Sequence, residues 1–456
     1  MTTDLTVGKV PRVILTFSLP LLLSTMLQQF YNLADSMIVG NFAGTVGLAA
    51  IGAAYPITLF FVAVATGASM GCSVVISQLF GARRMDELKQ AILTALISFA
   101  VLGAVLAGAG ALLSGTLMHL LNAQEDIFAP AKTYLIIYAL GVFPMLVYNA
   151  STGIFTGLGD AKLPLLLLCI TSVLNVILDY IAVRFLNWGV TGAAWATTLS
   201  QLVAAVLAVL FMRKRLRGLF PGRSKTHFST AILRDIAGAA VPCILQQGSV
   251  ALGHTIMQGI LNTYDTAIIA GYEAASKLHN FAYMGLNTIG SALASFTAQC
   301  YGAEKYKRIK EGYRVSLLIC LICAVCVIAL FVLIPDQLVG LFIDGDADPL
   351  VIEAGRNYLR LIGPLYSIIT VIITTGGLLR GVGRSTTFFI ETVLEFTVRI
   401  VMCFVLTKAL NSYTGLFWAW YFGSTSGFLL CTALSIQTFR KRLTPRAKST
   451  EQRVGG

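Results

Sequence analysis

The chain has 456 residues, a formal net charge of +12, and 56% hydrophobic against 12% charged residues. The low charge content and a mean hydropathy of +0.79 exclude a water-soluble protein, because soluble domains carry about a quarter charged residues. A basic chain can bind nucleic acid. Here, however, the basic residues gather in alternate connections between apolar runs, which is typical of a membrane protein and predicts no nucleic-acid partner.

Apolar runs of about 20 residues, each long enough to cross a bilayer, recur along almost the whole chain. Because lipid satisfies no backbone hydrogen bonds, these runs are expected to be helices. The sequence therefore predicts an all-α integral membrane protein with twelve transmembrane helices. The expected spans are 13–38, 48–79, 90–116, 130–156, 163–184, 189–212, 232–262, 266–299, 314–335, 350–379, 386–408 and 413–438.

The first span combines a proline with a polar face. Gln28, Tyr31 and Asp35 stand at positions i, i+3 and i+7, which places an amide, a phenol and a carboxylate on one helix face. An ionisable group inside a membrane helix is costly, so Asp35 is a functional candidate. Pro20 deletes a backbone hydrogen bond in the same helix and is a candidate hinge. No cleavage site follows a short apolar region, so we expect this span to be retained.

The fifth span contributes a second carboxylate. Asn175 and Asp179 are four residues apart and therefore adjacent on one helix face. If this face meets that of Asp35, two carboxylates and an amide come together, a group that suits Na⁺ coordination or proton carriage. Alternatively, Asp179 stands near the end of its span and only caps or anchors it.

Basic residues mark one side of the membrane. They occur at both termini, in alternate connections and in the run Arg213–Arg234, so the positive-inside rule places both termini and the central connection in the cytoplasm. An even number of spans agrees with this orientation. We expect an N-terminal six-helix lobe at 1–212, a cytoplasmic linker at 213–231, a C-terminal six-helix lobe at 232–438 and a basic cytoplasmic tail at 439–456.

The second half carries two acid–base spacings of one helical turn. Glu273 and Lys277 stand at i and i+4, as do Glu395 and Arg399. Such pairs either neutralise each other inside the bundle or contact a substrate in the cavity, and the sequence leaves both open. Glu391 has no local partner of opposite charge, which makes it the next candidate for a functional acid.

No motif for metal binding or catalysis stands out. Cys320, Cys323 and Cys326 lie in an apolar span with no nearby histidine, and small residues of this kind usually pack between membrane helices. The histidines form no triad, and no serine stands in a nucleophile elbow. We therefore expect no enzyme, no metal and no cofactor.

Four short correspondences in the same order relate the two halves. Each half has an even number of spans, so the halves are parallel repeats, and such repeats usually enclose a binding site near mid-membrane. The paired glycine motifs follow no strand, so they predict tight turns and not phosphate-binding loops. The matched segments are Ser18-Leu19-Pro20 with Ala240-Val241-Pro242, Gln78–Ala82 with Gln299–Ala303, Gly157-Leu158-Gly159 with Gly381-Val382-Gly383, and Thr191-Gly192 with Thr414-Gly415.

The repeat does not extend to the acids of the first half. Shifted by the same offsets, Asp35 falls on Met257 and Asp179 falls on Met402. Cation handling is thus predicted to belong to the N-terminal half alone.

These motifs resemble the multidrug and toxin extrusion (MATE) transporters of the MOP superfamily, and especially their DinF-like bacterial branch. The resemblance covers nearly all twelve spans. Its most specific motif is the Asn-x-x-x-Asp of the fifth span, Asn175 and Asp179. It also includes Pro20 and Asp35, the Gln-x-x-Gly-Ala motifs at Gln78 and Gln299, and the Gly-Leu-Gly-Asp turn at Gly157.

The resemblance implies a two-lobed bundle that rocks between outward-open and inward-open states. It implies exchange of Na⁺ or H⁺ inward for cationic or amphiphilic drugs outward, across the plasma (inner) membrane. The expected partners are such small molecules and membrane lipids, and we expect the chain to act as a monomer. The cation-coupling cluster that the family implies consists of Gln28, Tyr31, Asp35, Asn175, Asp179 and Thr197.

The main alternative is a lipid-linked oligosaccharide flippase of the same superfamily, whose anionic headgroup would require Arg or Lys from several spans. Only Lys277 and Arg399 are expected deep within spans, each with an acidic neighbour, which disfavours this alternative. A major facilitator transporter also has two six-helix halves. The turn Gly81-Ala82-Arg83-Arg84 lacks the Asp-Arg pattern of that group.

Overall fold

The computed structural model describes residues 4–42, 44–220, 226–343, 348–441 and 443, and within these ranges it is helical without a strand. The helices are α1 (Val10–Phe42), α2 (Gly44–Gly81), α3 (Met85–Leu120), α4 (Glu125–Gly157), α5 (Lys162–Asp179), the π-helix η1 (Tyr180–Phe185), α6 (Gly189–Leu219), α7 (Thr230–Leu261), α8 (Thr266–Gly302), α9 (Tyr306–Leu333), α10 (Pro335–Gly340), α11 (Pro349–Ile362), the 3-10 turn η2 (Gly363–Leu365), α12 (Tyr366–Gly381), α13 (Ser385–Leu410) and α14 (Thr414–Lys441).

These helices form twelve long rods when η1 continues α5, and when α11, η2 and α12 are joined. Over the described residues, nine rods are long and apolar enough to cross a membrane. The others, α8, α13 and α14, have 37, 26 and 28 residues. At a rise of about 1.5 Å per residue they also span a hydrocarbon core of about 30 Å. The predicted all-α fold with twelve spans is confirmed.

Most helices extend beyond the predicted spans, and some of them enter segments that were expected to be non-helical. α6 continues to Leu219, inside the segment expected as a linker, because the Arg, Lys and Leu residues there are good helix formers. α14 reaches Lys441, inside the expected tail, and residues 221–225 and 444–456 lie outside the described part. An unpredicted short helix, α10, begins with Pro335 at its first position.

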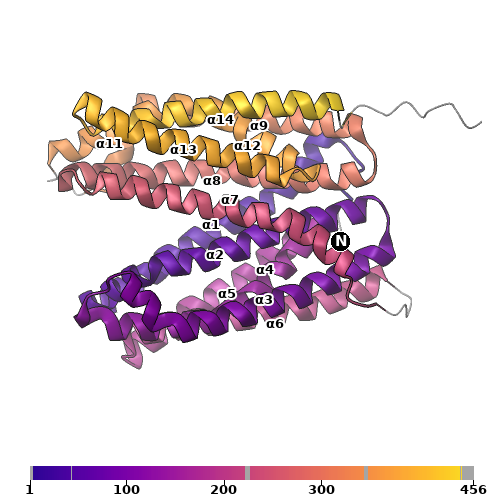
Figure 1. The fold of residues 1–456 in the computed structure, drawn as a ribbon, viewed down its shortest axis with the longest axis horizontal. Helices are drawn as coiled ribbons and strands as arrows, with labels where there is room; N and C mark the ends of the chain where they lie inside the picture. The colour runs from indigo at the N-terminus through magenta and orange to yellow at the C-terminus, as the bar shows by residue number, and fades with distance from the viewer. Residues whose placement is uncertain (1–3, 43, 221–225, 344–347, 442, 444–456) are drawn as a thin grey trace, which may run out of the picture.

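The rods are arranged in two groups (Figure 1). We call α1–α6 with η1 the N-lobe, and α7–α14 with η2 the C-lobe. The first helix of each lobe crosses between them. Val10, Ile14 and Phe17 at the start of α1 pack with C-lobe residues, whereas Val39 near its end packs with η1 and α6. Conversely, α7 starts in the N-lobe core and ends in the C-lobe core.

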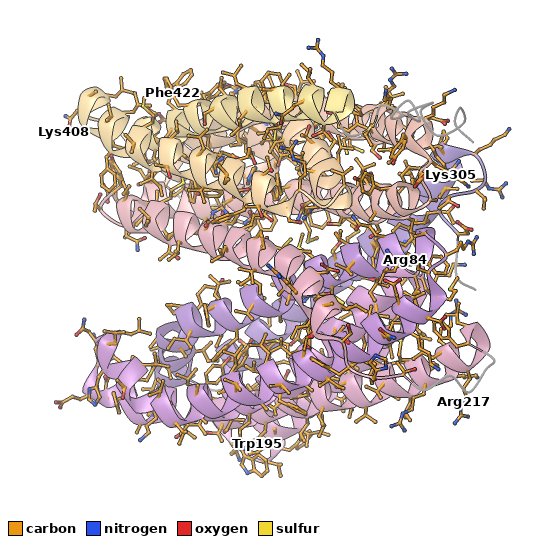
Figure 2. All side chains as sticks on the ribbon, turned by 45° about the vertical axis from the view of Figure 1, so that its right-hand side comes forward. Arg84, Trp195, Arg217, Lys305, Lys408 and Phe422 are labelled. Carbon is orange, nitrogen blue, oxygen red and sulfur yellow. The ribbon has the colours of Figure 1, made fainter. Side chains whose placement is uncertain are left out.

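One end of the molecule is basic. Figure 2 places Arg84, Arg217 and Lys305 at the same end, and the N-terminal segment Asp4–Gly8 lies there because it contacts Arg83 and Arg308. We call this the basic end. The turns after α2, α4, α8 and α12 meet there, as their mutual hydrogen bonds show.

The lobes contact each other at the basic end through reciprocal hydrogen bonds. Gln78 Nε2 of α2 donates to the Gly381 carbonyl oxygen at 3.0 Å, and Gln299 Nε2 of α8 donates to the Gly157 carbonyl oxygen at 2.9 Å. The repeat that relates the halves in sequence therefore also relates their contacts. The predicted tight turns are confirmed, because Gly159 and Gly383 adopt φ of +76° and +78°, which favours glycine.

Glycines bring the helix backbones of the two lobes together at this contact. A Cβ atom on Gly81 would lie 2.0 Å from the Gln299 carbonyl oxygen, and one on Gly302 would lie 2.0 Å from that of Gln78. On the neighbouring α2–α7 contact, a Cβ on Gly71 would lie 2.3 Å from the Ala240 Cα. Any side chain at these positions would therefore push the lobes apart.

The N-terminal segment lies across both lobes at the basic end. Arg308 donates to the carbonyl oxygens of Leu5, Val7 and Gly8, while Asp4 forms an ion pair with Arg83. Partial burial alone would raise the pKa of Asp4, but hydrogen bonds from Thr6 and the charge of Arg83 keep it below its ordinary value. The lowered pKa means that this ion pair persists at neutral pH and is lost only as the pH falls below the usual range for aspartate.

Candidate functional site

The two predicted carboxylates of the N-lobe meet. Asp35 of α1 and Asp179 at the end of α5 lie within hydrogen-bonding reach of each other. Asp179 is fully buried and Asp35 half-buried. Two carboxylates bring no hydrogen between them, so a hydrogen bond forms only when they share a proton. Accordingly, both oxygens of Asp179 and Oδ1 of Asp35 have no hydrogen-bond partner among the described residues.

Other predicted members surround this pair. Asn175 is 2% exposed, and neither atom of its side-chain amide has a partner among the described residues. Tyr31 lies beside both carboxylates and within hydrogen-bonding reach of Thr197 on α6. Gln28 lies on the same face of α1 as Tyr31 and Asp35, but its side chain is exposed.

Two tyrosines of α4 complete the site and were missed from sequence. Tyr138 lies near Asp35, and Tyr134 lies near Asp35, Asp179 and Tyr31. Their rings are 5.9 Å apart. The spacing of four residues on α4 was the available signal, but tyrosines are common in membrane spans and nothing local connected these two with the acids.

This arrangement can hold a small cation. Carboxylate, amide, phenol and hydroxyl oxygens are ligands for hard cations, and a buried carboxylate pair can instead share a proton. Holding two like charges in a dry site is unfavourable unless a cation or a proton offsets one of them. The N-lobe site therefore has the chemistry to exchange one positive charge with the solvent.

The C-lobe contains a separate group of charged and aromatic residues. Glu395 and Arg399 of α13 form the predicted ion pair, in which the Arg399 side chain is 2% and the Glu395 side chain 12% exposed. The Arg399 guanidinium also lies 3.8 Å from the centroid of the Trp420 ring and 4.7 Å from that of Phe396. These cation–π contacts further stabilise a buried charge.

Glu391 lies one turn from Glu395 on the same helix and is fully buried. Neither carboxylate oxygen has a hydrogen-bond partner among the described residues. A Cβ on Gly427 of α14 would lie 2.6 Å from Oε1 of Glu391, so the absence of a side chain at Gly427 makes room for the acid.

The second acid–base spacing of the C-lobe, that of Glu273 and Lys277, does not produce an ion pair among the described residues. Instead, the Lys277 ammonium lies 5.7 Å from the centroid of the Phe342 ring, and the Lys277 side chain is exposed. An i,i+4 spacing permits a pair on a helix surface but contributes only a few tenths of a kcal/mol, so a competing contact easily replaces it.

The buried pair of Glu395 with Arg399, and the acid Glu273 without an ion pair in the described ranges, allow a direct comparison of how much each acid contributes to the free energy of unfolding. Glu395→Gln is expected to lower the free energy of unfolding by about 3 kcal/mol, because it leaves Arg399 buried without its acid. Glu273→Gln is the matched control and should change stability by less than about 0.5 kcal/mol. Thermal unfolding in detergent, followed by tryptophan fluorescence, measures both. Equal melting temperatures for the two variants would contradict the expectation.

Arg380 is a buried cation that sequence reasoning missed. It directly precedes the turn Gly381-Val382-Gly383, and its sequence position predicts one of the basic residues that mark the cytoplasmic side. In the structure it is 3% exposed and lies within the last turn of α12. Burial in the protein differs between these basic residues: the Lys277 side chain is exposed, whereas Arg399 and Arg380 are 2% and 3% exposed.

Comparison with known families identifies the chain. The family model for MatE matches residues 20–181 and 242–405, more than half of the chain and parts of both lobes. The chain belongs to the MatE family. Members of this family are multi-pass membrane transporters and not enzymes, so the chain is a transporter of small molecules.

Individual relatives agree with this assignment. This MatE transporter is 27% identical over 397 residues to the probable multidrug resistance protein YpnP of Bacillus subtilis, which covers 87% of this chain and 88% of the relative. It is 25% identical over 411 residues to the FAD transporter of Shewanella oneidensis, with 88% of each chain covered.

A solved structure shares the fold. It is described as the outward-facing conformation of a multidrug resistance MATE family transporter of the MOP superfamily. The two chains superpose with a TM-score of 0.88 at 22% sequence identity, covering 96% of this chain and 99% of the other. The predicted family and fold class are confirmed.

Proposed function

We propose that this MatE transporter is a secondary active exporter of cationic or amphiphilic small molecules, driven by Na⁺ or H⁺ that enters through the N-lobe site. The observation that carries the proposal is the meeting of Asp35 and Asp179. A buried pair of carboxylates without hydrogen-bond donors binds and releases one positive charge, which is what coupling to an ion gradient requires.

The basic end gives the proposed orientation of the transporter in the membrane. By the positive-inside rule this end faces the cytoplasm, together with both termini of the chain. Export then requires a cavity that opens alternately to either side, and the inter-lobe contacts at the basic end are the ones that must break when it opens inward. Nothing in this cycle requires a second copy of the chain.

Bending of α1 at Pro20 is a proposed link between the cation site and the substrate cavity. The ring of Pro20 removes the N–H that would bond to the Thr16 carbonyl. One turn later, Ser24 Oγ donates to the carbonyl oxygen of Pro20 itself at 2.9 Å. A helix with a missing bond bends at lower cost. Charge exchange at Asp35 is thus proposed to change the bend of α1 and reshape the cavity beside it.

The names of the relatives support small molecules as substrates. YpnP is a probable multidrug resistance protein, and another relative is an FAD transporter, so both names refer to the transport of organic small molecules. A flippase for lipid-linked oligosaccharides is disfavoured, because Arg380 and Arg399 do not make the extended basic lining that a large anionic headgroup requires.

Ethidium efflux tests this proposal. Vesicles that contain the transporter are expected to export ethidium under an inward gradient of either Na⁺ or H⁺, imposed separately at zero gradient of the other ion. Fluorescence of ethidium bound to entrapped DNA measures the rate. Absence of gradient-dependent efflux under both conditions would contradict the proposed function.

A further inference from the structure

Arg380 is a buried arginine that has no acidic partner within the described part of the chain. Its Nε has no hydrogen-bond partner, and its Nη1 donates to the Met70 sulfur at 3.9 Å, a weak acceptor. It forms no ion pair among the described residues, whereas five other arginines do. The ring of Phe388 lies 5.4 Å from its guanidinium carbon and leaves its N–H donors unused.

Most of the hydrogen-bonding capacity of Arg380 is therefore unmet. A guanidinium presents five N–H donors in a planar fork that matches a carboxylate or a phosphate. Buried arginines in membrane proteins are rare, and they usually pair with an acid or mark a substrate pathway. Arg399 illustrates the first case, since it pairs with Glu395. Arg380 corresponds to the second.

The side chain of Arg380 lies at the seam between the lobes. Met70 belongs to α2 of the N-lobe, while Cys243, Tyr283 and Phe388 beside Arg380 belong to α7, α8 and α13 of the C-lobe. Met70 precedes Gln78 on α2 by eight residues, about 12 Å along the helix. The guanidinium therefore lies farther from the basic end than the inter-lobe hydrogen bond formed by Gln78.

A cavity lies on the other side of that hydrogen bond. It has a volume of about 1380 Å³ at the basic end, and its lining includes Val74, Gln78, Ala239, Gly302, Lys305 and Gly383. The residue next to Arg380, Gly381, accepts the hydrogen bond from Gln78. Breaking this bond and separating the lobes would open the cavity toward the guanidinium.

We propose that Arg380 binds the carboxylate or phosphate group of amphiphilic molecules that enter through this cavity, so that the transporter accepts amphiphilic substrates with an anionic group in addition to cationic ones. The proposal rests on the proposed function, since it concerns the substrates of the same export cycle. Arg380 would then determine specificity, because its charge stabilises the binding of an anionic group that an apolar cavity alone would disfavour.

A matched pair of dyes tests the proposal. Tetramethylrhodamine has a free carboxylate, and its methyl ester has the same ring system without that charge. Fluorescence polarisation measures binding of each dye to the transporter in phosphatidylcholine nanodiscs, which expose both faces. We expect the wild-type protein to prefer the free acid, and Arg380→Gln to weaken binding of the acid relative to the ester by about tenfold or more.

Two further variants separate charge from structure. Arg384→Gln changes an arginine one turn away that donates to Gln437 and Thr438, and it should keep the wild-type preference. Arg380→Lys keeps the charge but loses the planar fork, so it should show an intermediate preference. Any loss of stability common to Arg380→Gln and Arg380→Lys leaves the ratio of the two affinities unaffected.

The proposal is overturned if Arg380→Gln retains the preference for the acid, or if the wild-type protein binds both dyes equally or neither. Adding phosphatidylglycerol provides a second arm. If this anionic lipid abolishes the preference, Arg380 takes a lipid headgroup and the assignment to substrates is wrong. Ethidium efflux by the same wild-type preparation separates this inference from the proposed function, because efflux without a preference for the acid contradicts the inference alone.

Discussion

Asp179→Asn is expected to abolish gradient-driven ethidium export without unfolding the transporter. Asparagine has nearly the same shape but cannot exchange a charge, so the N-lobe site would no longer carry one inward. One ion that moves down a tenfold concentration gradient releases about 1.4 kcal/mol, so loss of its coupling corresponds to about a tenfold loss in the ethidium gradient that the exporter sustains. The steady-state ratio of ethidium across proteoliposome membranes measures this loss.

The fold should tolerate this substitution. Asp179 is fully buried with both oxygens lacking a partner among the described residues, and an amide is less costly than a carboxylate in such a place. Asp126→Asn is the matched control, since Asp126 is exposed in the first turn of α4, and it should leave the gradient unchanged. A sustained gradient equal to that of the wild type in Asp179→Asn would refute the coupling role.

A double-mutant cycle of Asp35 and Asp179 tests whether the two carboxylates act together. If the two carboxylates act as one unit, Asp35→Asn should lose as much as Asp179→Asn, and the double variant should lose little more than either single one. Additive losses would instead mean that the two acids act independently. This cycle distinguishes a shared cation or proton from two separate sites.

Gly302→Ala is expected to hold the lobes apart at the basic end. Its added Cβ would lie 2.0 Å from the Gln78 carbonyl oxygen, and both atoms belong to helix backbones that cannot rotate away. Overpacking of this kind costs about 1–3 kcal/mol, which changes the ratio of separated to closed lobes roughly five- to 150-fold. Export should fall accordingly, because the cavity no longer closes at this end.

Cysteine labelling provides the readout for lobe separation. Cys243 lies at the seam, is 2% exposed and is not part of a disulfide. In a variant that keeps only this cysteine, Gly302→Ala should speed its reaction with a maleimide. Gly238→Ala is the control, because a Cβ there meets nothing within 4 Å although Gly238 lines the same cavity. Equal labelling rates in the two variants would exclude the expected separation.

Local sequence determined the membrane-spanning architecture and half of the site. Hydrocarbon thickness fixes the length of an apolar helix, so the spans could be predicted from runs of residues alone. Helical periodicity likewise placed Gln28 with Asp35, and Asn175 with Asp179, on common faces. These features depend on interactions within one helix, and such interactions can be predicted from residues that are close together in the sequence.

Only the tertiary structure decided which faces meet. The contact of Asp35 with Asp179 joins α1 to α5, and Tyr134 and Tyr138 come from a third helix. The same holds for Glu273, whose spacing predicted a partner that another contact replaced. Pairing between helices depends on how side chains of distant segments pack, and no short-range pattern contains that information.

Arg380 shows the difference most clearly. As a sequence position it is a basic residue near a glycine turn, with the composition of a solvent-exposed loop. Its burial follows from the close approach of α2 to α7, which Gly67 and Gly71 permit because they lack side chains. It also follows from the position of the side chain between α2, α7, α8 and α13. The sequence determined that a charge stands there, and the packing of the two lobes decided that it is buried with no acidic partner among the residues that the structure describes.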